Sequence, residues 1–222
     1  MAKSFPNTGA TVGLAADRTA LTSPFAGMQF FETDTKALYL YNGSAWVSML
    51  DTDTPPGLVH INTTSMSAST GATISNCFSA DYVGYRINLN GSLGTSNGQN
   101  IYAQLTSSGT PSSSGYNMQR LYVQSTTVGG SRSTAATTGF TLSYVGTTSL
   151  DIGGNSVVDI FNPFLTKQTS CIVNSCYVDA SNVVNLDATA GLHTVLSSFD
   201  GIKVYPAAGT LTTTVSIYGY RT

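Results

Sequence analysis

Short runs in which hydrophobic and polar residues alternate recur along most of the chain. The clearest run, residues 211–220, places Leu211, Val215 and Ile217 on one face and residues such as Thr212 and Ser216 on the other. This two-residue period is that of a half-buried β-strand. Further runs of this kind, separated by turns rich in Ser, Gly and Asn, occupy residues 82–89, 101–105, 120–124, 140–145, 157–161, 171–178 and 202–205.

Residues 58–222 are therefore expected to form an all-β domain. Short, evenly spaced strands with no helical pattern of ten residues are typical of a β-sandwich, a jelly roll or a barrel. We expect an antiparallel β-sandwich head of the jelly-roll kind. The dipeptides Asn42-Gly43 and Asn90-Gly91 predict turns, because Asn and Gly tolerate positive φ. The Ser-, Gly- and Thr-rich residues 97–116 and 126–138 predict exposed loops.

A smaller pattern over residues 24–53 predicts a module of three short strands in a meander. Such a meander is marginal alone, so we expect its apolar face to pack against copies of itself. The residues expected at this subunit interface are Phe30, Leu38, Leu40, Trp46 and Val47. Two prolines in residues 54–57 predict a linker. Residues 1–23 show no regular period and predict an N-terminal arm, either frayed or ordered on a partner.

Charged residues are scarce along the whole chain. Nine Lys or Arg and eleven Asp or Glu make 9% of the residues, against roughly 25% in ordinary domains. Glu32 is the single Glu, and this lack of surface helix formers argues against a helical fold. A hydrophobic share of 41% argues against disorder, and a net charge of −2 argues against a nucleic-acid binder.

Three cysteines, Cys77, Cys171 and Cys176, make a poor disulfide framework because their number is odd. The spacing of five places Cys171 and Cys176 on opposite faces of a continuous strand. We expect buried free thiols, with a hairpin disulfide or a metal site as the alternative. No apolar run approaches the roughly 20 residues of a membrane span, and no signal peptide is visible at the N-terminus, so assembly in a cytosol is expected.

The residues that catalysis needs are few. His60 is expected to face outward from a strand. His193 could pair with Asp200, but no Gly-x-Ser-x-Gly sequence marks a nucleophile. Most Asp residues adjoin turn formers, where Asp caps a turn, and residues 151–155 suit a Gly-rich turn better than a calcium loop. The sequence therefore predicts no enzyme activity, no cofactor and no metal site. The 12 Tyr residues suit either half-buried strands or a binding surface.

Two stretches resemble parts of bacteriophage virion proteins. Residues 27–46, GMQFFETDTKALYLYNGSAW, resemble a small module common in tail-fibre proteins. Residues 159–222, with Asn162-Pro163-Phe164 and the final VSIYGYRT, are similar to C-terminal β-domains in structural proteins of phages that infect cyanobacteria and other marine bacteria. The chain departs from typical tail spikes in its shortness and in lacking a parallel β-helix and an acidic pair.

The resemblance implies a short, homotrimeric tail fibre or appendage of a virion. Its N-terminal arm would bind a portal, adaptor, tail or capsid protein, and its head would contact the host surface, where a glycan is the expected receptor. The residues expected to anchor the arm are Phe5, Pro6, Leu14, Arg18 and Leu21. The residues expected to contact the receptor are Tyr116, Tyr122, Ser131 and Arg132.

Two other functions remain open from the sequence. A capsid decoration or knob protein would have the same sequence features but would not need to bind a receptor. An enzyme that degrades host glycans is the less favoured alternative, because paired carboxylates at a suitable spacing are not evident. Neither nucleic-acid binding nor membrane insertion is expected.

Overall fold

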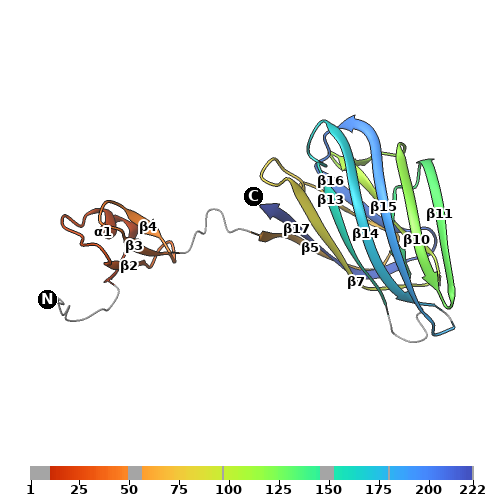
Figure 1. The fold of residues 1–222 in the computed structure, drawn as a ribbon, viewed down its shortest axis with the longest axis horizontal. Helices are drawn as coiled ribbons and strands as arrows, with labels where there is room; N and C mark the ends of the chain where they lie inside the picture. Colours follow the sequence, from red (N-terminus) through yellow and green to blue (C-terminus); the bar gives the residue numbers. More distant parts are fainter. Residues whose placement is uncertain (1–10, 50–56, 97, 146–152, 180, 222) are drawn as a thin grey trace. The chain divides into compact units, whose positions relative to one another are not determined.

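Residues 11–49, 57–96, 98–145, 153–179 and 181–221 are described by a computed structural model. The chain divides into two compact units, Met1–Pro55 and Pro56–Thr222 (Figure 1). Nearly all regular structure is β, which confirms the all-β fold class. Among the described residues the single helix is α1 (Ala15–Thr19).

The first unit contains a four-stranded sheet in the order β1-β2-β3-β4. Its strands are β1 (Thr11–Gly13), β2 (Gln29–Glu32), β3 (Leu38–Tyr41) and β4 (Trp46–Ser48). β1 runs parallel to β2, and the remaining neighbours pair antiparallel. The turn expected at Asn42-Gly43 lies between β3 and β4, with Gly43 at a φ of 102°. The Asn42 side chain accepts hydrogen bonds from the backbone N–H groups of Ser44 and Ala45, so it closes a four-residue loop.

The folded part of the first unit begins earlier than the sequence pattern predicts. Residues 11–19, expected within the arm, form β1 and α1. The Arg18 Nε lies 2.6 Å from Glu32 Oε1, and the Glu32 side chain is only 1% exposed. The Arg18 guanidinium also lies 4.0 Å from the centroid of the Tyr39 ring. This ion pair and the parallel pairing of β1 with β2 hold residues 11–19 in place, although their sequence shows no regular hydrophobic period.

The residues expected at a subunit interface have different environments. Phe30 is 1% exposed and meets Trp46 edge-on, with ring centroids 6.1 Å apart. Phe30 is thus packed inside its own unit, and assigning it to a subunit interface was wrong. Leu38, Leu40 and Trp46 are half-buried, and Val47 is exposed. Of the expected anchor residues, Leu14 is exposed, Leu21 is half-buried and Arg18 is in the ion pair, while Phe5 and Pro6 lie outside the described residues.

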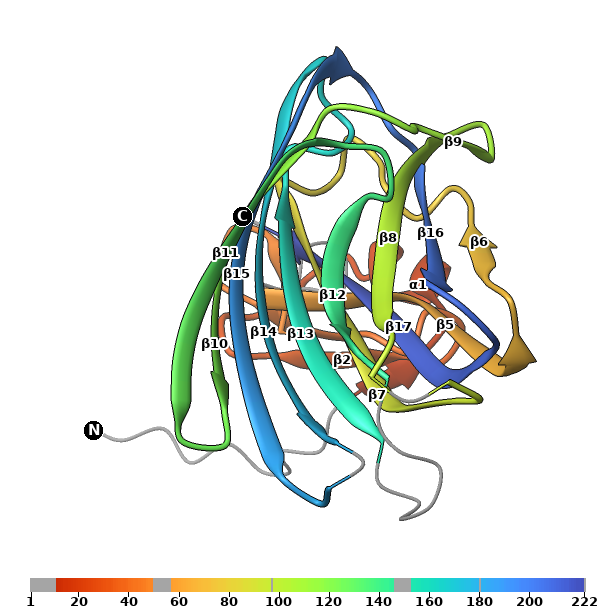
Figure 2. The same cartoon turned by 90° about the vertical axis from the view of Figure 1, so that its right-hand side faces the viewer.

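The second unit contains two sheets (Figures 1 and 2). One has eight strands in the order β11-β10-β15-β14-β13-β7-β17-β5, and the other has the order β12-β8-β16-β6 with β9 paired to β8. The strands are β5 (Gly57–Ser69), β6 (Ala72–Ile74), β7 (Gly84–Gly94), β8 (Asn100–Ser107), β9 (Thr110–Pro111), β10 (Tyr116–Gln124), β11 (Thr127–Ala136), β12 (Phe140–Tyr144), β13 (Gly154–Phe161), β14 (Lys167–Val178), β15 (Val184–Ser197), β16 (Gly201–Pro206) and β17 (Leu211–Arg221).

Both sheets contribute to one hydrophobic core, which gives the second unit a sandwich-like character. Leu89 and Ile217 come from the larger sheet, and Ile101, Leu142 and Ile202 come from the smaller one. Burial of these side chains is the main force holding the sheets together. The two sheets have eight and five strands, whereas a jelly roll has eight strands in total.

Three predictions from local sequence were wrong. The stretch 97–116, expected to be an exposed loop, contains β8, in which Ile101 and Leu105 are buried. Asn90-Gly91 lies inside β7, where Gly91 has a φ of +64° and the pairing with β17 shifts register between Thr212 and Thr214. The dipeptide makes a bulge there because two neighbouring strands continue past it. The expected loop at residues 126–138 is mostly β11, an edge strand paired to β10. Its Ser, Thr and Gly content resembles that of a loop because an edge strand needs few apolar side chains.

Candidate functional site

A recess of about 200 Å³ opens where the edges of the two sheets of the second unit meet. Its larger-sheet side is built from β10, β11 and β15, and its smaller-sheet side from β8 and β12 (Figure 2). Its lining includes Asn100, Tyr102, Met118, Arg120, Ser131, Arg132, Thr141, Tyr144 and Thr189. The recess is therefore rich in aromatic rings and hydroxyls and includes the Arg120 guanidinium.

Strand register explains why these residues meet. Arg120 of β10 is paired with Ser131 of β11 on one side and with Thr189 of β15 on the other. Paired residues point to the same face of a sheet, and the neighbouring Met118 packs against the hydrophobic core. The recess thus lies on the core-facing side of the larger sheet, at the end where that sheet terminates in β11.

Arg120 is held rigidly at the base of this arrangement. Its Nη2 lies 2.7 Å from Asp187 Oδ1, and its Nη1 donates a hydrogen bond of 2.8 Å to the Tyr144 hydroxyl. The guanidinium carbon lies 4.5 Å from the centroid of the Tyr122 ring and 4.6 Å from that of Tyr144. Burial raises the pKa of Asp187, and hydrogen bonding to Arg120 opposes that rise. Burial also raises the pKa of the Tyr144 hydroxyl, which therefore stays neutral.

Several polar atoms of the recess lack a partner among the described residues. Arg120 Nε and Asn100 Oδ1 are buried without a hydrogen bond. Asn100 Nδ2 does donate to the Tyr102 hydroxyl, at 2.9 Å. Arg132 is exposed, and among the described residues no carboxylate forms an ion pair with it. Buried polar atoms without a partner are uncommon in folded proteins, and aromatic rings beside a few polar groups are a usual feature of ligand sites.

The structure brings together two of the four expected receptor residues. Ser131 lines the recess, and Tyr122 packs under Arg120. Arg132 borders the recess, but it is paired with Gln119, so its side chain points to the opposite face of the sheet from that of Arg120. Tyr116 does not belong with them: it is fully buried, its hydroxyl accepts from the backbone N–H of Leu105 at 2.9 Å, and assigning it to the receptor surface was wrong. The alternating sequence pattern does not show whether a Tyr at the start of a strand faces the core or the solvent.

Arg120, Tyr102 and Tyr144 were missed as site residues. The sequence does contain one signal for Arg120, because it is the first charge after an uncharged run that begins beyond Arg86. An isolated charge in a β-strand needs a partner or an exposed position. Asp187, its partner, is distant in sequence, and no local pattern joins the two.

A second polar pair lies near the other end of β10. Ser112 Oγ lies 3.0 Å from His193 Nε2, and the His193 ring is buried between Tyr116 and Phe199. His193 Nδ1 has no partner among the described residues, and burial lowers the pKa of His193. The His193–Asp200 pair considered from the sequence is not formed, because Asp200 instead accepts hydrogen bonds from the backbone N–H of Ser108.

The three cysteines are free. Cys171 is buried and Cys176 is exposed, so the two do point to opposite faces of β14. The expectation that all three thiols are buried was wrong for Cys176. Burial raises the pKa of Cys77 and that of Cys171 to about 12. His60 faces outward from β5, as expected.

The described part of the chain contains no group of three His, Cys, Asp or Glu side chains placed to hold a metal ion. In the same residues no helix has the length and apolar character needed to cross a membrane. No protein-family model, curated protein or solved structure matches the chain.

Proposed function

We propose that the chain is a virion structural protein whose second unit binds carbohydrate on a host surface through the recess. The observation that supports this best is the combination of half-buried tyrosines, Tyr102 and Tyr144, with hydroxyl and amide groups in one hollow. Aromatic faces pack on the C–H groups of a sugar ring, while polar side chains bond its hydroxyls. The role is one of attachment rather than catalysis.

In this proposal the first unit, which includes the N-terminal arm, connects the protein to another virion component, which is a portal, adaptor, tail or capsid protein. The compact sheet with its Arg18–Glu32 ion pair is a rigid base for such a connection. Labelling of intact particles tests the assignment: an appendage is labelled at one vertex or at the tail. Label spread over the whole shell, at tens to hundreds of copies, would instead support a decoration protein.

The carbohydrate proposal is tested by glycan binding of purified full-length protein. Tyr102→Ala is expected to weaken binding of any recognised glycan about three- to tenfold, the usual worth of an aromatic contact. Tyr218→Ala is the matched control, because Tyr218 is a half-buried tyrosine that packs on His60 of β5, away from the recess. Equal binding by both variants, with equal thermal stability, would contradict the proposal.

Assembly as a homotrimer is also part of the proposal. Exposed Leu121, Val157, Ile172 and Leu186 lie on one face of the larger sheet, across four neighbouring strands and beside the Arg86–Asp159 ion pair. Arg86 and Asp159 neutralise each other, so these apolar side chains can be covered by another copy of the chain without bringing an unpaired charge of that pair to the contact. Ile172→Lys is expected to lower the trimer fraction in light scattering, whereas Gln124→Lys, which adds the same charge at an exposed hairpin end, is not. A wild-type monomer at micromolar concentration would refute this assembly.

A further inference from the structure

The charges at the recess are balanced, although two arginines border it. Arg132 is paired with Gln119, so its side chain points to the opposite face of the larger sheet from that of Arg120. The charge of Arg120 is cancelled by Asp187, whose Oδ1 lies 2.7 Å from Arg120 Nη2. Among the described residues no Asp, Glu or Lys lines the recess. A ligand in the recess therefore meets an arginine that already has its counter-ion.

The groups left to bind a ligand are uncharged. The Tyr144 hydroxyl accepts a hydrogen bond of 2.8 Å from Arg120 Nη1. The Tyr102 hydroxyl accepts one of 2.9 Å from Asn100 Nδ2. Each hydroxyl keeps its own proton to donate, and neither proton has an acceptor among the described residues. Further lining residues that carry a hydroxyl are Ser131, Ser133, Thr138, Thr141 and Thr189. Sugar hydroxyls both donate and accept hydrogen bonds, so they complement these groups.

We infer that the recess selects an uncharged sugar residue and that Asp187 sets this selectivity by cancelling the charge of Arg120. This inference rests on the proposed carbohydrate-binding function and adds the charge class of the ligand and the residue that determines it. A carboxylate on the ligand would lose its water without gaining a free cation, which is costly. The volume, about 200 Å³, is below that of sites for drug-sized ligands, so it suits one sugar residue of a longer chain.

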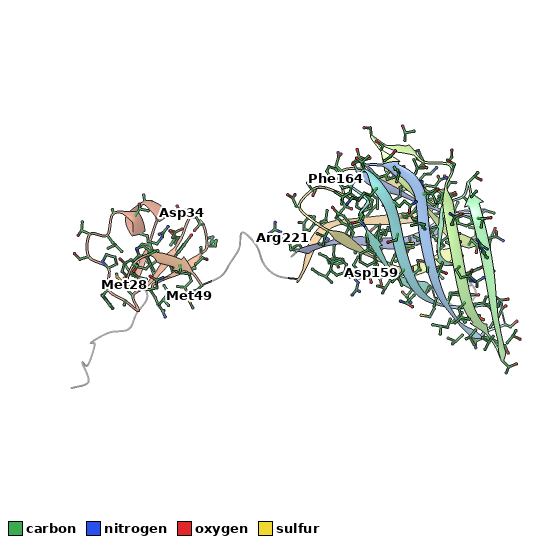
Figure 3. The ribbon with its side chains drawn as sticks, turned by 45° about the horizontal axis from the view of Figure 1, so that its top comes forward. Met28, Asp34, Met49, Asp159, Phe164 and Arg221 are labelled. Carbon is green, nitrogen blue, oxygen red and sulfur yellow. The ribbon has the colours of Figure 1, made fainter. Side chains whose placement is uncertain are left out.

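A second arginine pair in the same unit supplies a matched control. Arg86 donates to Asp159 through Nε and Nη2, with each hydrogen bond 2.9 Å long (Asp159 is labelled in Figure 3). Strand register places this pair in one row with Gln119, on the face opposite to that of Arg120. Asp187→Asn and Asp159→Asn therefore each free the charge of one arginine, the first beside the recess and the second on the other face of the sheet.

Paired saccharides that differ in charge test the inference on purified full-length protein. The probes are gluco-, manno- and galacto-oligosaccharides, each with the corresponding uronic-acid oligomer. At about 0.15 M salt, the wild type is expected to bind the neutral member of a pair about threefold or more tightly than the acid. In Asp187→Asn the order is expected to reverse, with the acid bound about tenfold more tightly than by the wild type, since charge-assisted hydrogen bonds are roughly twice as strong as neutral ones. Asp159→Asn is expected to keep the wild-type order.

The outcomes separate the inference from the function it rests on. Ser131→Lys adds a cation at an exposed lining position and should also reverse the order, which keeps the test decisive if Asp187→Asn does not fold. A neutral preference that survives in folded Asp187→Asn or in Ser131→Lys, or that is lost equally in Asp159→Asn, would overturn the inference. Equal binding of both members by the wild type, weakened by Tyr102→Ala, would leave carbohydrate binding standing and overturn the selectivity. Failure of every saccharide to bind would remove both.

Discussion

The ion pair between Arg120 and Asp187 allows a quantitative test of how this low-charge domain holds its few charges. The Arg120 side chain is 17% exposed and that of Asp187 is 5% exposed. Arg120→Met keeps most of the side-chain volume and removes the charge, which leaves a buried carboxylate without its partner. Breaking a buried pair in this way costs about 3–5 kcal/mol, and the partial exposure of Arg120 places the expected loss near 3 kcal/mol.

Urea unfolding measures this loss with an internal control. Far-UV circular dichroism follows mainly the second unit, whereas fluorescence of the single tryptophan, Trp46, reports on the first. Arg120→Met is expected to lower the urea midpoint of the second unit by about 1 to 2 M and to leave the Trp46 transition unchanged. Arg86→Met is the comparison, since its pair with Asp159 is 35% and 22% exposed and such pairs contribute about 1 kcal/mol or less.

The stability that Arg120→Met loses should also depend on pH, and the direction of that dependence can be predicted. Burial raises the pKa of Asp187, so the contribution of this group is fully present below its unfolded pKa and is lost as pH rises through the folded pKa. Removing Arg120 removes the interaction that opposes this rise. The difference between variant and wild type should therefore grow as pH rises from about 4 to 7. A loss that is the same at both pH values, or no larger than that of Arg86→Met, would refute the reasoning.

Three further results are expected. Phe30→Ala should cost the first unit about 3 kcal/mol or more, because Phe30 is 1% exposed, and Trp46 fluorescence should show that unit unfolded while the second unit keeps its strands. Hydrogen bonds from Thr35 and Arg18 lower the pKa of Glu32. Their contribution to the stability of the first unit is present above about pH 4.3 and is lost as pH falls through the folded pKa. Glu32→Gln should therefore make the Trp46 unfolding transition less dependent on pH in the acid range. A thiol reagent should modify one cysteine per native chain, the exposed Cys176, and three after denaturation; a different native count would show that the burial is wrong.

The β class followed from sequence because alternation along strands such as β17 has a direct physical cause, the burial of one sheet face. The sheet partners did not follow, because pairing depends on contacts between residues far apart in the chain. The pair Arg86–Asp159 spans 73 residues and the pair Arg120–Asp187 spans 67. Local rules also mislead where neighbours decide the outcome, as at Asn90-Gly91, which resembles a turn but continues a strand.

The site was only partly predictable for the same reason. Ser131 was found because it lies in a stretch that looks polar and exposed, although that stretch is a strand instead of a loop. Tyr144 gains its place only when β12 meets β10 across the two sheets, through the Arg120 hydrogen bond. No pattern within a single strand contains that information.

Most of the other charged residues of the second unit satisfy the fold itself. Asp179 and Asp200 accept hydrogen bonds from backbone N–H groups, so they close turns. Lys203 lies 5.1 Å from the centroid of the Tyr205 ring. A chain with so few charges has used most of them to satisfy its own fold, and a cation that neither closes a turn nor pairs is the exception. Among the described residues Arg132 and Lys167 are both such cations, and both are exposed, so water solvates their charges without a carboxylate partner.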